Sequence, residues 1–131
     1  MKKMFKETLL IVVLLSGTLA HGQHKIPEAV RSSTPEQRAS ALTEVMKQEL
    51  TLSDDQVPRI HEVNLKYAEL AEAEKDKNTS KREKFSRVKE LDMQKEADLK
   101  PVLTDDQLEE YSKHKKDYMQ KMIEKLEESL E

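Results

Sequence analysis

Three residues near the C-terminus have a spacing that could hold a metal ion. Glu110, His114 and Asp117 stand at positions i, i+4 and i+7, which places them on one face of a helix. Structural zinc sites use four ligands, mainly cysteine and histidine, whereas this face offers one histidine and two carboxylates. We interpret it as a hydrated helix surface and predict no metal ligand and no cofactor. Weak zinc binding is the alternative.

Catalytic chemistry needs reactive groups that converge in a pocket closed to water. The chain has no cysteine, and its serines fall at expected helix starts or in polar stretches. Both glycines, Gly17 and Gly22, precede residue 23, so the rest of the chain lacks the residue that phosphate loops and tight hairpins require. We therefore predict a protein that is not an enzyme and binds no nucleotide.

Mixed cations and apolar side chains offer another kind of chemistry, the binding of unfolded polypeptide. Opposite charges speed association, and small apolar contacts add attraction. The best local mixture consists of Arg82, Lys84, Phe85, Arg87, Val88 and Lys89. Adaptable contacts could come from the methionines Met46, Met93, Met119 and Met122. The alternative is that Phe85 and Val88 are core residues and the cations are simply solvated.

Residues 1–22 have the organisation of a cleavable export signal. Three lysines precede an apolar run over 9–15, and Ala20 and Gly22 stand at the −3 and −1 positions of a cut before Gln23. The run is shorter than the roughly 20 residues that span a bilayer. We expect a periplasmic protein with no membrane span after cleavage. The alternative is an uncleaved anchor.

Cleavage would leave residues 23–131, a length typical of one domain. Three basic side chains and one acidic side chain leave with the signal, so 20 basic and 25 acidic residues remain and the net charge becomes −5. A negative chain is a poor partner for nucleic acid. Without disulfides, so small a domain depends on helix packing or on association of copies. We expect a homodimer.

Four capping motifs predict the helices that position these groups. The first is Thr34 followed by Pro35 and Gln37. The other three pair Ser53 with Gln56, Ser80 with Glu83 and Thr104 with Gln107. Residues 23–33 show no apolar periodicity and are expected to form a flexible arm before a helical domain over 34–131.

Prolines and polar interruptions modify these helices. Pro58 lies one position too deep to lose its N–H without cost, so the second helix should have a distorted first turn or a later start. Pro101 should end the third helix. The apolar stripe of the third helix thins through 92–98 and resumes at Leu99, while Lys115 interrupts the stripe of the fourth.

The starts of the second and fourth helices repeat each other at an offset of 51 residues. The matched segments are 52–56 and 103–107, and apolar positions downstream agree as well. The aligned downstream pairs are Val57 with Leu108, Ile60 with Tyr111 and Tyr67 with Tyr118. The repeat predicts four helices in two pseudo-repeated helical hairpins. Coincidence between two good helix starts is the alternative.

The paired motifs resemble those of the Spy/CpxP family of periplasmic proteins. Leu103, Thr104 and Gln107 form an intact Leu-Thr-x-x-Gln motif, and Leu52, Ser53 and Gln56 form the same motif with serine in place of threonine. The resemblance covers roughly residues 34–120. This chain departs from the family pattern at Ser53, at Pro58 and in its net negative charge.

The resemblance implies an all-α, four-helix protomer in a thin, curved homodimer. It also implies ATP-independent binding of unfolded or misfolded envelope proteins, which suppresses their aggregation. Relatives that inhibit an envelope-stress sensor kinase or respond to zinc supply two alternatives. In these, the chain regulates such a sensor or responds to a metal.

Overall fold

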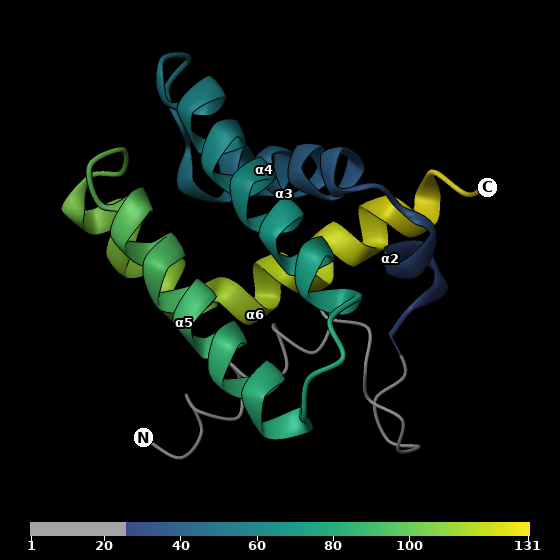
Figure 1. Cartoon of the computed structure of the whole chain (residues 1–131). Helices are drawn as coiled ribbons and strands as arrows, with labels where there is room; N and C mark the ends of the chain where they lie inside the picture. Colours follow the sequence, from purple (N-terminus) through teal and green to yellow (C-terminus); the bar gives the residue numbers. More distant parts are fainter. Residues whose placement is uncertain (1–25) are drawn as a thin grey trace.

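The computed structural model describes residues 26–131, and these residues form helices joined by short turns and loops (Figure 1). The predicted all-α class is confirmed, with no strand among the described residues. The predicted export signal over 1–22 lies outside the described part of the chain. The helices are α2 (Glu28–Ser32), α3 (Pro35–Leu50), α4 (Gln56–Lys75), α5 (Lys81–Leu99) and α6 (Asp105–Glu128).

The predicted count of four helices is wrong, because the described residues form five. The additional helix, α2, lies in the segment that we expected to be a flexible arm. It buries Ala29 and Val30 in the main core and contacts α6. A helix of five residues is too short to show apolar periodicity, and its two apolar side chains acquire a partner only when α6 is in place.

The helix starts follow from local hydrogen bonding. Thr34 accepts from the N–H of Gln37, whose side chain accepts in return from the N–H of Thr34. α4 begins later than its motif, at Gln56, after a tight turn in which the carbonyl of Ser53 accepts from Gln56 and Val57. This later start agrees with the expectation from Pro58, which has no N–H to donate.

The helices enclose one main core. α3 packs along α4 and crosses α6, while α5 packs against α4. Figure 1 shows α5 and α6 diverging from the turn that joins them. Met46, Ile60, Leu99 and Met122 are almost fully buried, so the core draws on all four long helices. Within residues 26–131, no helix is both long and apolar enough to cross a bilayer.

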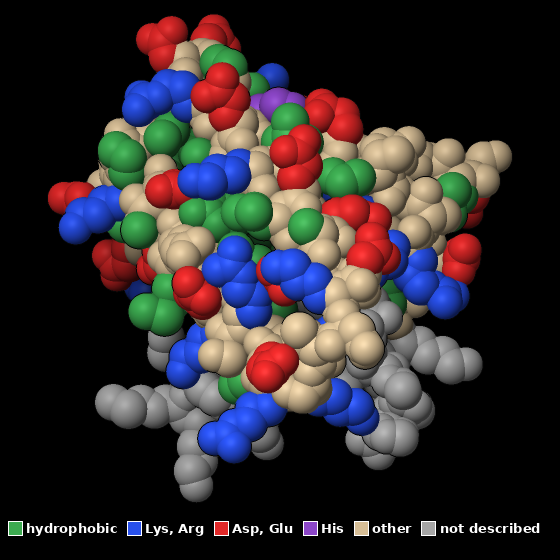
Figure 2. Space-filling view, in the orientation of Figure 1, with side chains coloured by type: hydrophobic (Ala, Val, Ile, Leu, Met, Phe, Trp, Pro, Cys, Tyr) green, Lys and Arg blue, Asp and Glu red, His purple; other side chains and the backbone are tan. Residues whose placement is uncertain are grey.

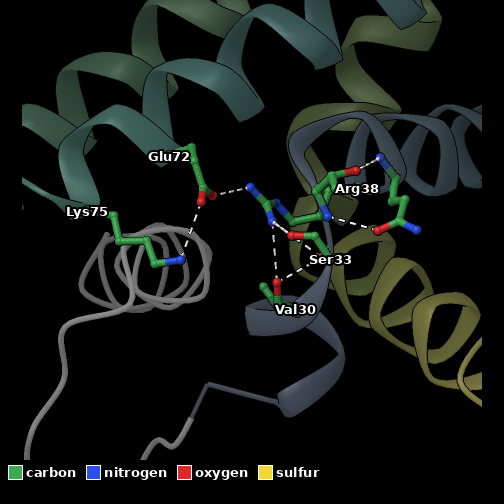
Figure 3. A network of polar contacts seen from close by, with 7 residues as sticks. Val30, Ser33, Arg38, Glu72 and Lys75 are labelled. Atoms are coloured by element: carbon green, nitrogen blue, oxygen red, sulfur yellow. Dashed lines mark hydrogen bonds and ion pairs between the residues drawn. The ribbon is translucent and has the colours of Figure 1, made fainter.

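Arg38 ties the turn between α2 and α3 to α4 (Figure 3). Its guanidinium donates to the carbonyl of Ser33 at 2.7 Å and to the carbonyl of Val30 at 3.3 Å. The other terminal nitrogen donates to Glu72 at 2.6 Å, and Lys75 pairs with the same carboxylate. Burial, the largest single influence, would raise the pKa of Glu72, but the hydrogen bonds and charges of Arg38 and Lys75 together outweigh it and lower that pKa. The network therefore fixes α2 against the rest of the protein.

Candidate functional site

The side chains of the two motif glutamines, Gln56 and Gln107, form hydrogen bonds with each other, and we call these residues the glutamine pair. The amide nitrogen of Gln56 donates to the carbonyl oxygen of the Gln107 side chain at 2.7 Å. The reverse hydrogen bond, from Gln107 to Gln56, measures 3.2 Å. The repeat at an offset of 51 residues thus brings equivalent side chains together.

Each glutamine side chain also forms hydrogen bonds with backbone groups around it. Gln107 caps α6 by accepting from the N–H of Thr104 at 2.9 Å, and its amide donates to the carbonyl of Leu50 at 3.1 Å. Gln56 likewise accepts from the N–H of Ser53 and donates to the carbonyl of Val102. Each side chain therefore makes two donor and two acceptor bonds, the full capacity of an amide. A glutamate could cap in the same way but could not donate to its partner.

A second polar contact joins the middles of α5 and α6. Lys115 lies 3.0 Å from Asp92 and 2.9 Å from Glu96, and the Lys115 and Asp92 side chains are only 14% and 12% exposed. Ser112 donates to Glu96 at 2.7 Å. The site was not predicted, although a signal was present. Two apolar stripes were interrupted by residues of opposite charge, and these interruptions pair with each other.

The pKa directions follow from this pairing. Burial would lower the pKa of Lys115, but its hydrogen bond to Glu96 and the charge of Asp92 raise it above its ordinary value. Burial would raise the pKa of Glu96, and the hydrogen bonds from Lys115 and Ser112 lower it. Burial, followed by the charges of Asp92 and Glu96, raises the pKa of the Tyr111 hydroxyl. The ion pair therefore remains charged over the physiological pH range.

The four long helices surround a cavity of about 60 Å³, which we call the central cavity. Its wall is mainly apolar, and its polar members include Arg38, Asn64, Glu74, Lys95 and Lys115. Figure 2 shows apolar side chains gathered near the middle of the drawn face, with charged side chains around them.

Lys95 differs from its neighbour Lys115. It is partly buried, and among the described residues its ammonium has no ion pair or hydrogen bond. Burial lowers its pKa to about 8, against the attraction of Asp92 and with help from the charge of Lys115. Of the two lysines that line the cavity, Lys115 thus has two carboxylate partners and Lys95 has none between residues 26 and 131.

The predicted client-binding residues separate into two groups. Val88 is buried and lines the central cavity, and Phe85 is half-buried. Arg87 lies 3.2 Å from both Glu74 and Glu90, so it stabilises the contact between α5 and α4. Arg82 and Lys89 are exposed, and Lys84 is partly exposed. The six residues therefore do not share one exposed surface, and their binding of clients stays a prediction.

The exposed members belong to a longer stripe on α5, which we call the outer face of α5. Arg82, Lys89 and Met93 recur at helical spacing, and the Met93 side chain is 65% exposed. Ser86 and Ala97 share this face, and a shallow depression runs along it between Ser86 and Ala97. Cations and an adaptable apolar side chain are thus presented together to solvent.

The candidate metal residues do not come together. His114 lies 3.5 Å from Glu110, while Asp117 pairs with Lys121 at 3.4 Å. No group of three or more possible ligands occurs between residues 26 and 131. His114 instead marks a kink in α6, where its backbone leaves helical geometry at φ −117° and ψ 16°.

Comparison with known proteins places the chain in a family. Neither the curated proteins nor the solved structures searched gave a match. A scan against protein families matched residues 22–111, more than half of the chain and a range that contains both motifs of the glutamine pair. The chain therefore belongs to the family described as "Domain of unknown function (DUF4890)".

Proposed function

We propose that this protein is an ATP-independent chaperone of the periplasm, which binds unfolded or misfolded envelope proteins and suppresses their aggregation without performing chemistry. The observation that carries the proposal is the outer face of α5. There, exposed Met93 lies on one stripe with the cations Arg82 and Lys89. The similarity of the two motifs to those of the Spy/CpxP family supports the same function.

The physical argument rests on weak and adaptable contacts. Exposed cations steer acidic segments toward the surface, and their effect is screened beyond ~10 Å at 0.1 M salt. The flexible thioether of a methionine fits many apolar side chains without demanding one shape. Such a surface binds many unfolded segments and releases each as it folds, so no nucleotide is needed.

The assembly that we propose is a thin homodimer of two pseudo-repeated hairpins. The glutamine pair supports the pseudo-repeat, because equivalent residues of the two motifs meet in it. The chain has no cysteine and therefore no disulfide to stabilise so small a domain, which favours association of two copies. Light scattering at micromolar concentration should report a dimer mass. A monomer with a sharp unfolding transition would contradict the dimer.

The decisive experiment measures aggregation of several unrelated clients by light scattering. The double variant Arg82→Glu with Met93→Gln should lose most of the protection, especially at low salt and with acidic clients. A matched control is Lys116→Glu with Leu130→Gln, which makes the same kinds of change at exposed positions on and beyond α6.

The results separate this function from its alternative. Equal protection by both double variants would place the client surface elsewhere. A protein that leaves aggregation unchanged but binds one sensor domain with fixed stoichiometry would be a regulator of envelope stress rather than a chaperone. Both double variants change exposed side chains, so melting temperatures should remain close to that of the parent protein.

A further inference from the structure

The central cavity has an apolar wall and room for a small apolar group. Its volume of about 60 Å³ compares with the ~10–15 Å³ that one water-sized group needs, so it has room for a short branched alkyl chain. Apolar cavities favour apolar occupants over water. The wall is formed by Leu42, Ala68, Val88, Leu91, Tyr118 and Met122, among others.

Lys95 supplies a cation at this cavity. It follows Leu91 by one helical turn on α5, and both residues line the cavity. Asp92, the acidic neighbour whose charge acts on Lys95, already accepts a hydrogen bond from Lys115. A partly buried cation without a partner is unfavourable, so a carboxylate that arrives from outside gains a charge-assisted hydrogen bond.

Two buried polar atoms, on residues of the same wall, also lack a hydrogen-bond partner among the described residues 26–131. The hydroxyl of Thr43 donates to the carbonyl of Ala39 at 2.7 Å, so it must accept from the amide of Asn64 at 2.9 Å. This fixes the orientation of the amide and leaves Oδ1 of Asn64 without a donor in the part of the chain that the structure describes. Nε of Arg38 is likewise unpaired, and the two residues are only 2% and 3% exposed.

We propose that the central cavity binds a small monocarboxylic acid whose alkyl body fills the cavity and whose carboxylate pairs with Lys95. Asn64 and Arg38 provide an acceptor and a donor for a further polar group or for water that enters with the acid. This site is separate from the outer face of α5 and does not depend on the chaperone proposal.

The test is direct titration of the protein with isovalerate, followed by calorimetry and by chemical-shift changes. Isoamyl alcohol has the same branched alkyl end without a charge, and acetate has the carboxylate without that alkyl end. Isovalerate should bind at least roughly tenfold more tightly than either, because a hydrogen bond between charged groups is worth about that factor. Lys95→Met should remove the advantage over the alcohol, and Lys95→Arg should retain it.

Two further variants complete the design. Lys116→Met removes an exposed lysine of α6 and should leave binding unchanged. Ala68→Leu should fill the cavity and abolish binding of both isovalerate and the alcohol, with a melting curve to check that the protein is folded. Equal binding of isovalerate and isoamyl alcohol to the parent protein, equal binding of acetate, or unchanged binding to Lys95→Met would overturn the proposal. No client is present, so failure of the chaperone proposal would not affect the result.

Discussion

The glutamine pair and the central cavity differ in whether their polar groups have hydrogen-bond partners among the described residues. In the pair, both amides use all their donors and acceptors. In the cavity wall, Oδ1 of Asn64, Nε of Arg38 and the ammonium of Lys95 are without partners within the described structure. An unsatisfied buried group costs about 1–3 kcal/mol, so a complete network stabilises the fold and an incomplete one favours a ligand. The difference separates a region that holds the protein together from a region suited to binding.

The largest effect should come from Lys115→Met, which leaves Asp92 and Glu96 facing each other without their ammonium. We expect a loss of about 3 kcal/mol in the free energy of unfolding, at the lower end for a broken buried ion pair because Glu96 is partly exposed. Urea unfolding measures it. The control is Lys113→Met, whose ion pair with Glu109 is exposed and should contribute much less to stability. Equal losses in the two variants would mean that burial does not strengthen the Lys115 contact.

A smaller loss should follow from disrupting the glutamine pair. Gln107→Ala removes a cap and leaves Gln56 without its partner, so we expect a loss of about 2 kcal/mol in unfolding free energy. Gln107→Glu keeps the capping acceptor but not the donors, and its loss should be smaller than that of Gln107→Ala.

A double-mutant cycle tests whether the two glutamines act as a unit. The combined Gln56→Ala and Gln107→Ala protein should be more stable than the sum of the single losses predicts, because the second change no longer breaks the shared bonds. Gln48→Ala, at an exposed glutamine of α3, is the control. Simple additivity would show that the hydrogen bonds between Gln56 and Gln107 contribute little.

Lys95→Met should stabilise the protein by about 1 kcal/mol at neutral pH, because it removes a partly buried cation that has no ion-pair partner within the described residues. The pKa of Lys95 falls from 10.5 to about 8 on folding, so the unfolded chain binds more protons between these values. The stability of the parent protein should therefore rise across this interval through Lys95, and the advantage of the variant should shrink.

The charged and titratable groups around the cavity bear on that measurement. They are Asp92 on α5, Lys115, Tyr111 and Tyr118 on α6, Tyr67 and Glu74 on α4 and Arg38 on α3. Because they are common to both proteins, the difference between the two pH–stability curves isolates Lys95. A difference that does not change from pH 7 to pH 10 would show that Lys95 titrates normally in the folded protein.

Thr104→Ala should have the smallest effect on stability, a loss of about 1 kcal/mol, which is usual for a helix cap. Thr104→Ser should change stability little, since Ser53 serves the equivalent position in the other motif. Thermal melts at one pH measure both. If Thr104→Ala leaves the melting temperature unchanged and yet abolishes client protection, the motif contacts clients directly.

Local sequence was enough to predict where the long helices begin. A hydroxyl followed three residues later by glutamine, at Thr34 and Thr104, satisfies backbone N–H groups within one turn, so no distant contact is needed. The later start of α4 also has a local cause, because Pro58 has no N–H to donate. The short helix α2 escaped prediction because it is stabilised by burial against α6, which is distant in the sequence, and by hydrogen bonds from Arg38 on the next helix.

The sequence by itself therefore determined the helical class, the long helices and the interruptions in their apolar stripes. Only the tertiary structure decided which of the charged residues that interrupt these stripes pair with each other. Asp92 and Lys115 lie 23 residues apart, and their separation of 3.0 Å depends on how α5 and α6 are placed relative to each other. Lys95 lies on the same helix as Asp92, yet it has no ion pair or hydrogen bond among residues 26–131. Capping is decided by neighbours in the chain, whereas partner choice inside a core depends on the three-dimensional packing of whole helices.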